Sequence, residues 1–145
     1  MIGLIQRVES ASVVIEGDPA AAIDAGIMLL LGVEKGDEQA KADRLLQRVL
    51  NYRIFADEQG RMNCSLLDLE HELLIVPQFT LPADTRKGNR PGFSPAAPPE
   101  LGRELFGYFC QQAEARLGQL NCGVFGADMK VHLINDGPVT FWLQQ

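Results

Sequence analysis

The sequence has no long apolar run and no export signal. The apolar stretch at residues 27–33 is far shorter than the roughly 18 residues that a membrane span needs. Residues 1–7 contain no basic region followed by an apolar core and a cleavage site. We therefore expect a cytoplasmic protein without a membrane partner.

Cysteine and histidine are scarce. The three cysteines, Cys64, Cys110 and Cys122, are widely spaced and form no Cys-x-x-Cys pair. Two of them could pair, but this number and spacing favour reduced thiols. Because only His71 and His132 accompany them, a structural zinc site is disfavoured, and we expect neither a metal nor a cofactor.

The common catalytic motifs are missing too. There is no Gly-x-Ser-x-Gly elbow, no glycine-rich phosphate loop, no His-Glu-x-x-His and no dinucleotide-binding fingerprint. No pair of carboxylates stands out as an acid and base couple. An enzyme with this sequence would have to work without a conventional nucleophile and base.

The chain also lacks an excess of positive charge, because 19 acidic residues outweigh 13 basic ones and give a net charge of −6. This balance disfavours broad binding to nucleic-acid phosphates, and we expect no DNA partner. Two local basic clusters remain, Arg44, Arg48 and Arg53 on the first predicted helix and Arg86, Lys87 and Arg90 in a loop. Each is either a local basic patch or an ordinary solvated surface, and the loop is the candidate for contact with an RNA backbone.

What is present indicates a single domain over residues 1–145, of the α/β class and α+β type. Apolar spacing predicts one helix from a cap at Asp37 to about Tyr52 and a second from Pro99 to about Leu117. Turns are expected at 17–19 and 57–60, and strands at 2–8, 13–15, 26–33, 73–79, 123–125, 129–134 and 139–143. These elements predict a strongly curved, barrel-like sheet with two main helices.

Proline marks two unusual segments. Residues 82–99 hold five of the eight prolines and must be irregular, and loops of this length are often functional. The pair Gly137-Pro138 lies between two apolar stretches, although proline cannot donate a ladder hydrogen bond. Glycine lets another group approach the main chain closely. The pair therefore predicts a backbone shaped for contact.

Two peptides resemble the signature motifs of the D-aminoacyl-tRNA deacylases, also called D-tyrosyl-tRNA(Tyr) deacylases. They are Pro77-Gln78-Phe79-Thr80-Leu81 and Asn135-Asp136-Gly137-Pro138-Val139-Thr140. Segments 1–17, 29–37, 51–63 and 123–144 resemble the same family, so the likeness covers essentially the whole chain. It implies a homodimer that hydrolyses the ester between a D-amino acid and the 3′ end of tRNA, with glycine also accepted.

By this resemblance, Gly137-Pro138 is a cis pair that enters the pocket of the partner subunit. Its main chain would occupy the space that an L side chain needs, so selectivity would come from exclusion. Arg7 would brace this segment. Achiral glycine would pass because it presents no side chain to exclude.

The resemblance also places Gln78, Phe79 and Thr80 around the aminoacylated adenosine, with Phe125 and Met129 along the adenosine-facing pocket. Thr80 is either a nucleophile or an orienting hydroxyl, and the second is favoured because no base is evident. The 2′-hydroxyl of the tRNA would then assist attack by water. Main-chain N–H groups near Phe79 and Thr80 would hold the carbonyl oxygen.

The first motif departs from the family pattern at Pro77, where serine is usual. The change removes a hydroxyl and a backbone donor. A related animal group of deacylases has Pro-Gln-Ala-Thr-Leu, whereas Phe79 and the intact Gly-Pro-Val-Thr favour the D-specific family. The residues alone leave two other functions open: a non-catalytic dimeric module that binds a small ligand, and an esterase or peptidase with Thr80 as nucleophile.

Overall fold

The central strands of the sheet are buried on both faces. In the computed structural model, which describes residues 1–145, Ile27 and Leu29 of one strand belong to a large core, while Met28 between them belongs to a smaller one. Residues 73–76 of the neighbouring strand alternate in the same way. Burial on both faces explains why these strands read as continuous apolar runs rather than as alternating ones.

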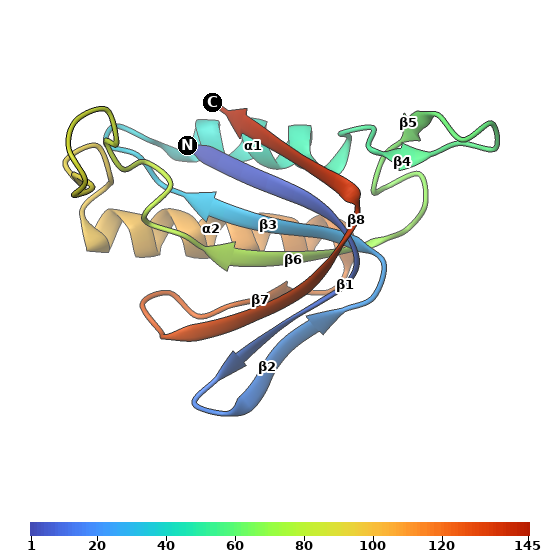
Figure 1. Ribbon diagram of the computed structural model, residues 1–145, viewed down its shortest axis with the longest axis horizontal. Helices are drawn as coiled ribbons and strands as arrows, with labels where there is room; N and C mark the ends of the chain where they lie inside the picture. Colours follow the sequence, from blue (N-terminus) through green and yellow to red (C-terminus); the bar gives the residue numbers. More distant parts are fainter.

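The chain contains eight strands and two helices, and Figure 1 labels them. In chain order they are β1 (Ile2–Ile15), β2 (Asp18–Ile23), β3 (Gly26–Gly32), α1 (Gln39–Leu50), β4 (Phe55–Ala56), β5 (Met62–Cys64), β6 (Glu72–Pro77), α2 (Pro99–Leu117), β7 (Asn121–Cys122) and β8 (Met129–Gln144). Both predicted helices are confirmed, and the turn predicted at 57–60 joins β4 and β5 as a hairpin.

Six strands form one strongly curved sheet in the order β2-β1-β3-β6-β7, with β8 paired to β1. The pairs β3–β6 and β6–β7 are parallel, and the others are antiparallel. The first half of β1 pairs with β3 and the second half with β2. The sheet therefore curves along the length of this long strand. Figure 1 shows the predicted barrel-like sheet and two main helices, and both helices lie on one side of the sheet.

The larger core lies between the helices and the sheet. Leu45, Leu46 and Val49 of α1 and Leu105 and Phe109 of α2 are buried in it. The smaller core lies on the other face, under the curl of β1, β2 and β8. Neither helix combines the length and the apolar character that crossing a membrane would require.

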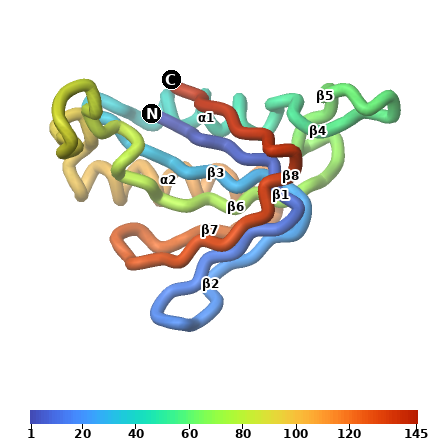
Figure 2. The backbone as a smooth tube through the Cα atoms, viewed as in Figure 1, coloured from blue at the N-terminus to red at the C-terminus, as the bar shows by residue number.

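The two ends of the chain lie side by side, as Figure 2 shows. The Met1 ammonium group donates to the main-chain oxygen of Gln145 and to Oδ1 of Asp37, each at 2.8 Å. Asp37 was expected to cap α1, and this was wrong. The N-cap is Glu38, without a side-chain cap bond, because the buried Asp37 carboxylate instead accepts from Met1 and from the N–H of Glu34.

Three predicted strand boundaries were also wrong. β6 ends at Pro77 rather than at residue 79, because a turn closes between Gln78 and Leu81. β7 ends at Cys122, and residues 123–125 are not a strand since the chain turns back through Gly126, whose φ is +84°. The stretches 129–134 and 139–143 are parts of one strand, β8, interrupted by a bulge.

Candidate active site

A pocket of about 520 Å³ opens where the parallel strands β3 and β6 end. The first turns of α2, the turn before β8 and the beginning of β8 complete its walls. Carboxyl ends of parallel strands are a common place for ligand sites, and this volume is in the usual range for small ligands. Five residues that the sequence assigned to a substrate pocket line it: Pro77, Gln78, Phe79, Phe125 and Met129.

Two glycines let the walls of this pocket approach one another. A Cβ atom on Gly123 would lie 2.6 Å from Sδ of Met129 and 3.3 Å from Cδ of Pro77. A Cβ atom on Gly102 of α2 would lie 3.1 Å from Cζ of Phe125. Larger residues at these positions would displace the pocket wall, since real Cβ contacts are rarely this short.

Phe125 is held in place by two neighbours on α2. Its ring centroid lies 6.1 Å from that of Phe106, and the guanidinium of Arg103 lies 5.1 Å from it. Aromatic and cation–π contacts of this kind fix the orientation of a ring. Sequence reasoning missed Arg103, which looks like any exposed basic residue of an amphipathic helix.

The first motif forms a tight turn beside the pocket. The N–H of Gln78 donates to the main-chain oxygen of Leu31 at 2.8 Å, which continues the ladder between β6 and β3 by one bond. The Gln78 side chain then donates from Nε2 to Oγ1 of Thr80 at 2.6 Å. Thr80 is exposed and adjoins the pocket without lining it. The only side-chain hydrogen bond to its hydroxyl comes from Gln78, and no basic group contacts it.

Two main-chain donors at this turn are unused. The N–H groups of Phe79 and Thr80 have no acceptor in the chain, although the turn is closed by the bond from Leu81 N to Gln78 O. Both residues are exposed, and Phe79 lines the pocket. Adjacent free N–H groups can stabilise an oxygen that becomes negative during attack on a carbonyl carbon.

The second motif is a wide bulge in β8. In the β1–β8 register, residues 136–139 stand opposite the single residue Arg7. Because β8 pairs with β1 alone, a bulge on this edge accommodates Pro138 within a strand. Gly137 has a φ of +139°, and its bond to Pro138 is cis. Both residues of the pair are exposed, so their main chain faces outward.

Arg7 holds the start of the bulge. Its Nε donates to the main-chain oxygen of Asp136 at 3.0 Å and forms an ion pair with Oδ2 of the same residue, also at 3.0 Å. Its Nη1 donates to the main-chain oxygen of Ile54 at 2.7 Å. The largely buried Arg7 side chain thus ties the segment before Gly137 to the chain that follows α1.

Asn135 holds the end of the bulge, and sequence reasoning missed it. Its Oδ1 accepts from the N–H of Val139 at 2.7 Å, and its Nδ2 donates to Oγ1 of Thr140 at 3.0 Å. Asparagine is favoured in turns because its side chain bonds nearby main chain. That preference, in an Asn-Asp-Gly-Pro sequence, was the available signal.

Within one chain, the two motifs are apart. Val131 lines the pocket, and Gly137 lies on the same strand at a separation of about 20 Å at the usual rise per residue. No residue of the bulge lines the pocket. The structure therefore brings Phe125 and Met129 to the first motif, but leaves Gly137, Pro138 and Arg7 in another part of the molecule.

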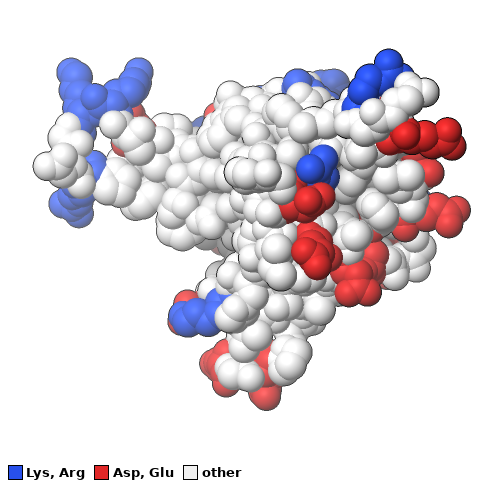
Figure 3. Space-filling model, turned by 45° about the vertical axis from the view of Figure 1, so that its right-hand side comes forward, with Lys and Arg blue, Asp and Glu red and all other residues white.

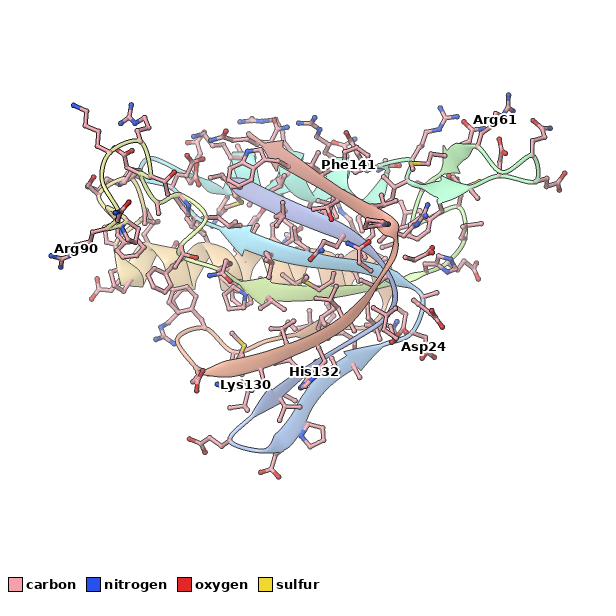
Figure 4. The ribbon with its side chains drawn as sticks, in the orientation of Figure 1. Asp24, Arg61, Arg90, Lys130, His132 and Phe141 are labelled. Carbon is pink, nitrogen blue, oxygen red and sulfur yellow. The ribbon has the colours of Figure 1, made fainter.

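The predicted basic cluster lies at the tip of the loop between β6 and α2, at the left of Figure 1, and Figure 3 shows the basic side chains at that end of the molecule. Arg86 is paired with Asp84 at 2.8 Å, and its side chain holds the pKa of that carboxyl well below its usual range. Lys87 and Arg90 have no partner in the chain. Figure 4 shows Arg90 pointing away from the body of the molecule.

The fold and the pocket define a small α+β protein with a strongly curved sheet and a ligand-sized pocket at the ends of two parallel strands. A family model described as D-Tyr-tRNA(Tyr) deacylase matches residues 4–144. The chain belongs to this family and is a hydrolase that acts on ester bonds.

The relatives agree over the full length. The chain is 57% identical over 144 residues to a protein of Janthinobacterium sp. (strain Marseille), and 58% identical over 144 residues to one of Pseudomonas putida. Both are named D-aminoacyl-tRNA deacylase, and the alignments cover 99% of this chain and 97% and 99% of those proteins.

Solved structures share the fold. One described as a c-Myc DNA unwinding element binding protein has a TM-score of 0.95 and 39% identity, covering 100% of this chain and 99% of that one. Another, described as a probable eukaryotic D-amino acid tRNA deacylase, has a TM-score of 0.84 at 15% identity, covering 99% of this chain and 98% of that one.

Proposed function

We propose that this protein hydrolyses the ester bond between a D-amino acid and the 3′-terminal adenosine of tRNA, releasing the free D-amino acid and tRNA. The observation that carries the proposal is the pair of unused N–H groups, on Phe79 and Thr80, beside a pocket of nucleoside size. The relatives at 57% and 58% identity carry the name of this activity. The reaction is a proofreading step of translation in the cytoplasm.

The reaction needs no side-chain nucleophile. Water attacks the ester carbonyl carbon, the carbonyl oxygen accepts hydrogen bonds from the N–H groups of Phe79 and Thr80, and the bond to the ribose 3′-oxygen breaks. That oxygen leaves with a proton, and the neighbouring 2′-hydroxyl of the tRNA assists the transfer. Gln78 holds the Thr80 hydroxyl at 2.6 Å, which suits an orienting role. Phe125 and Met129 enclose the adenosine.

Selectivity for D-amino acids comes from steric exclusion by Gly137-Pro138 of a partner subunit. The pair is exposed and lies about 20 Å along β8 from the pocket of its own chain, so it reaches a pocket only in a homodimer. Exposed apolar residues near it, Ile134 at 55% and Trp142 at 49%, suit a subunit contact. Glycyl-tRNA is accepted because glycine has no side chain to exclude.

Pro77 changes the edge of this pocket, where the family usually has serine, but it leaves the proposed catalytic donors intact. It ends β6, lines the pocket and has no N–H to offer the substrate. Phe79 and Thr80, which follow it, keep their free donors. The tRNA backbone contacts Arg86, Lys87 and Arg90, while the net charge of −6 argues against a DNA partner.

The test is incubation of the protein with D-tyrosyl-tRNA and L-tyrosyl-tRNA, beside a Thr80→Ala variant. We expect release of D-tyrosine only, and activity of Thr80→Ala that stays within about tenfold of the wild type, as for the loss of one hydrogen bond worth about 1 kcal/mol. No release of either enantiomer would favour a non-catalytic binding module. Abolition by Thr80→Ala would make this hydroxyl the nucleophile, and release of both enantiomers would contradict exclusion by the Gly-Pro pair.

A further inference from the structure

Two phenylalanines form an exposed aromatic platform at the mouth of the pocket. Phe79, which lines the pocket, is 61% exposed, and Phe93, which does not, is 44% exposed. Their ring centroids lie 5.4 Å apart with an angle of 47° between the planes. Large aromatic rings left this open to water on a small protein indicate a binding surface.

The platform is fixed, although Phe93 belongs to the irregular segment between β6 and α2. Asp84 and Gly92 exchange two main-chain hydrogen bonds, of 2.7 and 3.0 Å, which close the loop that carries the basic tip. Further along, Lys35 N donates to Pro95 O at 2.9 Å and Ala97 N to Val33 O at 3.0 Å, which attach the segment to the end of β3. Phe93 lies between these two attachments.

Positive charge lies on the same loop as Phe93. Lys87 and Arg90 are exposed on the tip that Asp84 and Gly92 close, and neither has an anionic partner in the chain. The segment between β6 and α2 thus carries both unpaired cations and the exposed ring of Phe93. This combination is the usual means by which proteins bind a single strand of nucleic acid, with bases stacked on rings and phosphates near cations.

We propose that Phe93, together with Phe79, stacks the base of the unpaired nucleotide that precedes the terminal adenosine of the tRNA, while Lys87 and Arg90 neutralise the adjoining phosphates. This inference rests on the proposed function, which places the terminal adenosine in the pocket that Phe79 lines. The next nucleotide must leave through the mouth of that pocket. Phe93 is therefore a substrate-positioning residue and takes no part in the bond-breaking step.

A single-stranded RNA end fits this surface better than a protein partner does. The loop that carries Phe93 also carries the unpaired cations Lys87 and Arg90, which match phosphates in charge, and Phe79 of the platform lines the pocket. Stacking on a ring does not distinguish one base from another, so the platform would serve every tRNA equally.

The test uses an RNA hairpin with an unpaired 3′ end, whose terminal adenosine carries D-tyrosine through a non-hydrolysable amide. A second probe lacks the base of the preceding nucleotide. Fluorescence anisotropy gives the Kd of each probe for the wild type, Phe93→Ala and Phe93→Tyr. Leu69→Ala, which truncates an exposed apolar residue outside the pocket, is the control.

We expect Phe93→Ala to weaken binding of the intact probe roughly tenfold, with Phe93→Tyr and Leu69→Ala close to the wild type. Removal of the base should weaken binding to the wild type by at least this factor and binding to Phe93→Ala by clearly less, because the variant has already lost the part of the stacking that Phe93 provides. Unchanged affinity of Phe93→Ala, or equal effects of base removal on both proteins, would overturn the inference. Base-dependent binding without hydrolysis of D-tyrosyl-tRNA would instead overturn only the proposed function.

Discussion

The Arg7 guanidinium contacts Asp136 at two oxygens: Nε lies 3.0 Å from the main-chain oxygen and 3.0 Å from the carboxylate oxygen Oδ2. This contact fixes the residue immediately before Gly137, at the point where residues 136–139 bulge out of β8. The largely buried Arg7 side chain thus holds the main chain in place next to Gly137. The proposed exclusion of L-amino acids by Gly137-Pro138 depends on the position of this main chain.

Arg7→Lys should therefore reduce deacylation of D-tyrosyl-tRNA. A lysine cannot bond Asp136 and Ile54 together, so the variant forgoes hydrogen bonds worth about 1–3 kcal/mol and the bulge loosens. The readouts are kcat/KM and Tm. Arg61→Lys is the control, since its pair with Asp57 is exposed and it lies at the far end of the β4–β5 hairpin (Figure 4). Equal kcat/KM for the two variants would show that Arg7 does not hold the filter.

Gly137→Ala should damage the filter more severely. The φ of +139° disfavours any side chain, and a Cβ atom would lie 2.6 Å from Cγ2 of Val139 and 3.2 Å from the Arg7 guanidinium. A shift of this main chain by about 1 Å should lower kcat/KM roughly 100-fold. Gly107→Ala on α2, where a Cβ atom meets nothing, should keep full activity and unfold at a slightly higher temperature. Wild-type activity and chirality in Gly137→Ala would count against the filter.

The basic loop should contribute to tRNA binding unevenly. The double variant Lys87→Ala/Arg90→Ala should weaken binding at low salt and flatten the dependence of log K on log salt by roughly 0.7–0.9 for each phosphate that the variant no longer neutralises. Arg86→Ala should have a smaller effect, because Asp84 already neutralises Arg86. The measurement is a titration of tRNA at several salt concentrations. Unchanged affinity of the double variant at low ionic strength would remove the loop from the interface.

Asp37→Ala should destabilise the fold without touching the pocket. The Asp37 side chain is fully buried and accepts from the Met1 ammonium, the N–H of Glu34 and Nζ of Lys41. Its removal takes away one of the two carboxylates that pair with the buried Met1 ammonium, Glu34 being the other, and the lost charged hydrogen bonds should cost about 2 kcal/mol in the free energy of unfolding. Glu38→Ala, at the N-cap that makes no side-chain bond, should stay within about 0.5 kcal/mol of the wild type in urea denaturation. Equal stability of the two variants would contradict this role of Asp37.

The sequence predicted the elements well because their apolar patterns are local. The helical spacing of Leu45, Leu46 and Val49 located α1, and the continuous apolar run of 26–33 located β3 within a residue. Where tertiary contacts compete with local preference, the predictions failed. Asp37 has the chemistry of a cap, but the chain terminus, distant from α1 in sequence, takes its carboxylate instead.

The sequence predicted which residues belong to the candidate site, but it did not predict how they are arranged in space. The motifs named Gln78, Phe79 and Gly137, and the pocket does collect the first two. The width of the bulge opposite Arg7 was not predictable, because register is set by pairing between strands far apart in sequence. The contact between Phe93 and Phe79 could not be predicted for a similar reason, because only the folded loop brings the two rings together.

The most direct test of the central claim, that the Gly-Pro pair of one subunit acts in the pocket of the other, is subunit complementation. Two differently tagged variants, Gly137→Ala and Gln78→Ala/Phe79→Ala, are co-expressed, and the heterodimer is purified through both tags. It contains one intact pocket facing one intact Gly-Pro pair only if the pair acts across the interface. The account predicts D-tyrosyl-tRNA deacylation at about half the wild-type rate per dimer, although each variant alone is nearly inactive. A heterodimer as inactive as its parents would contradict it.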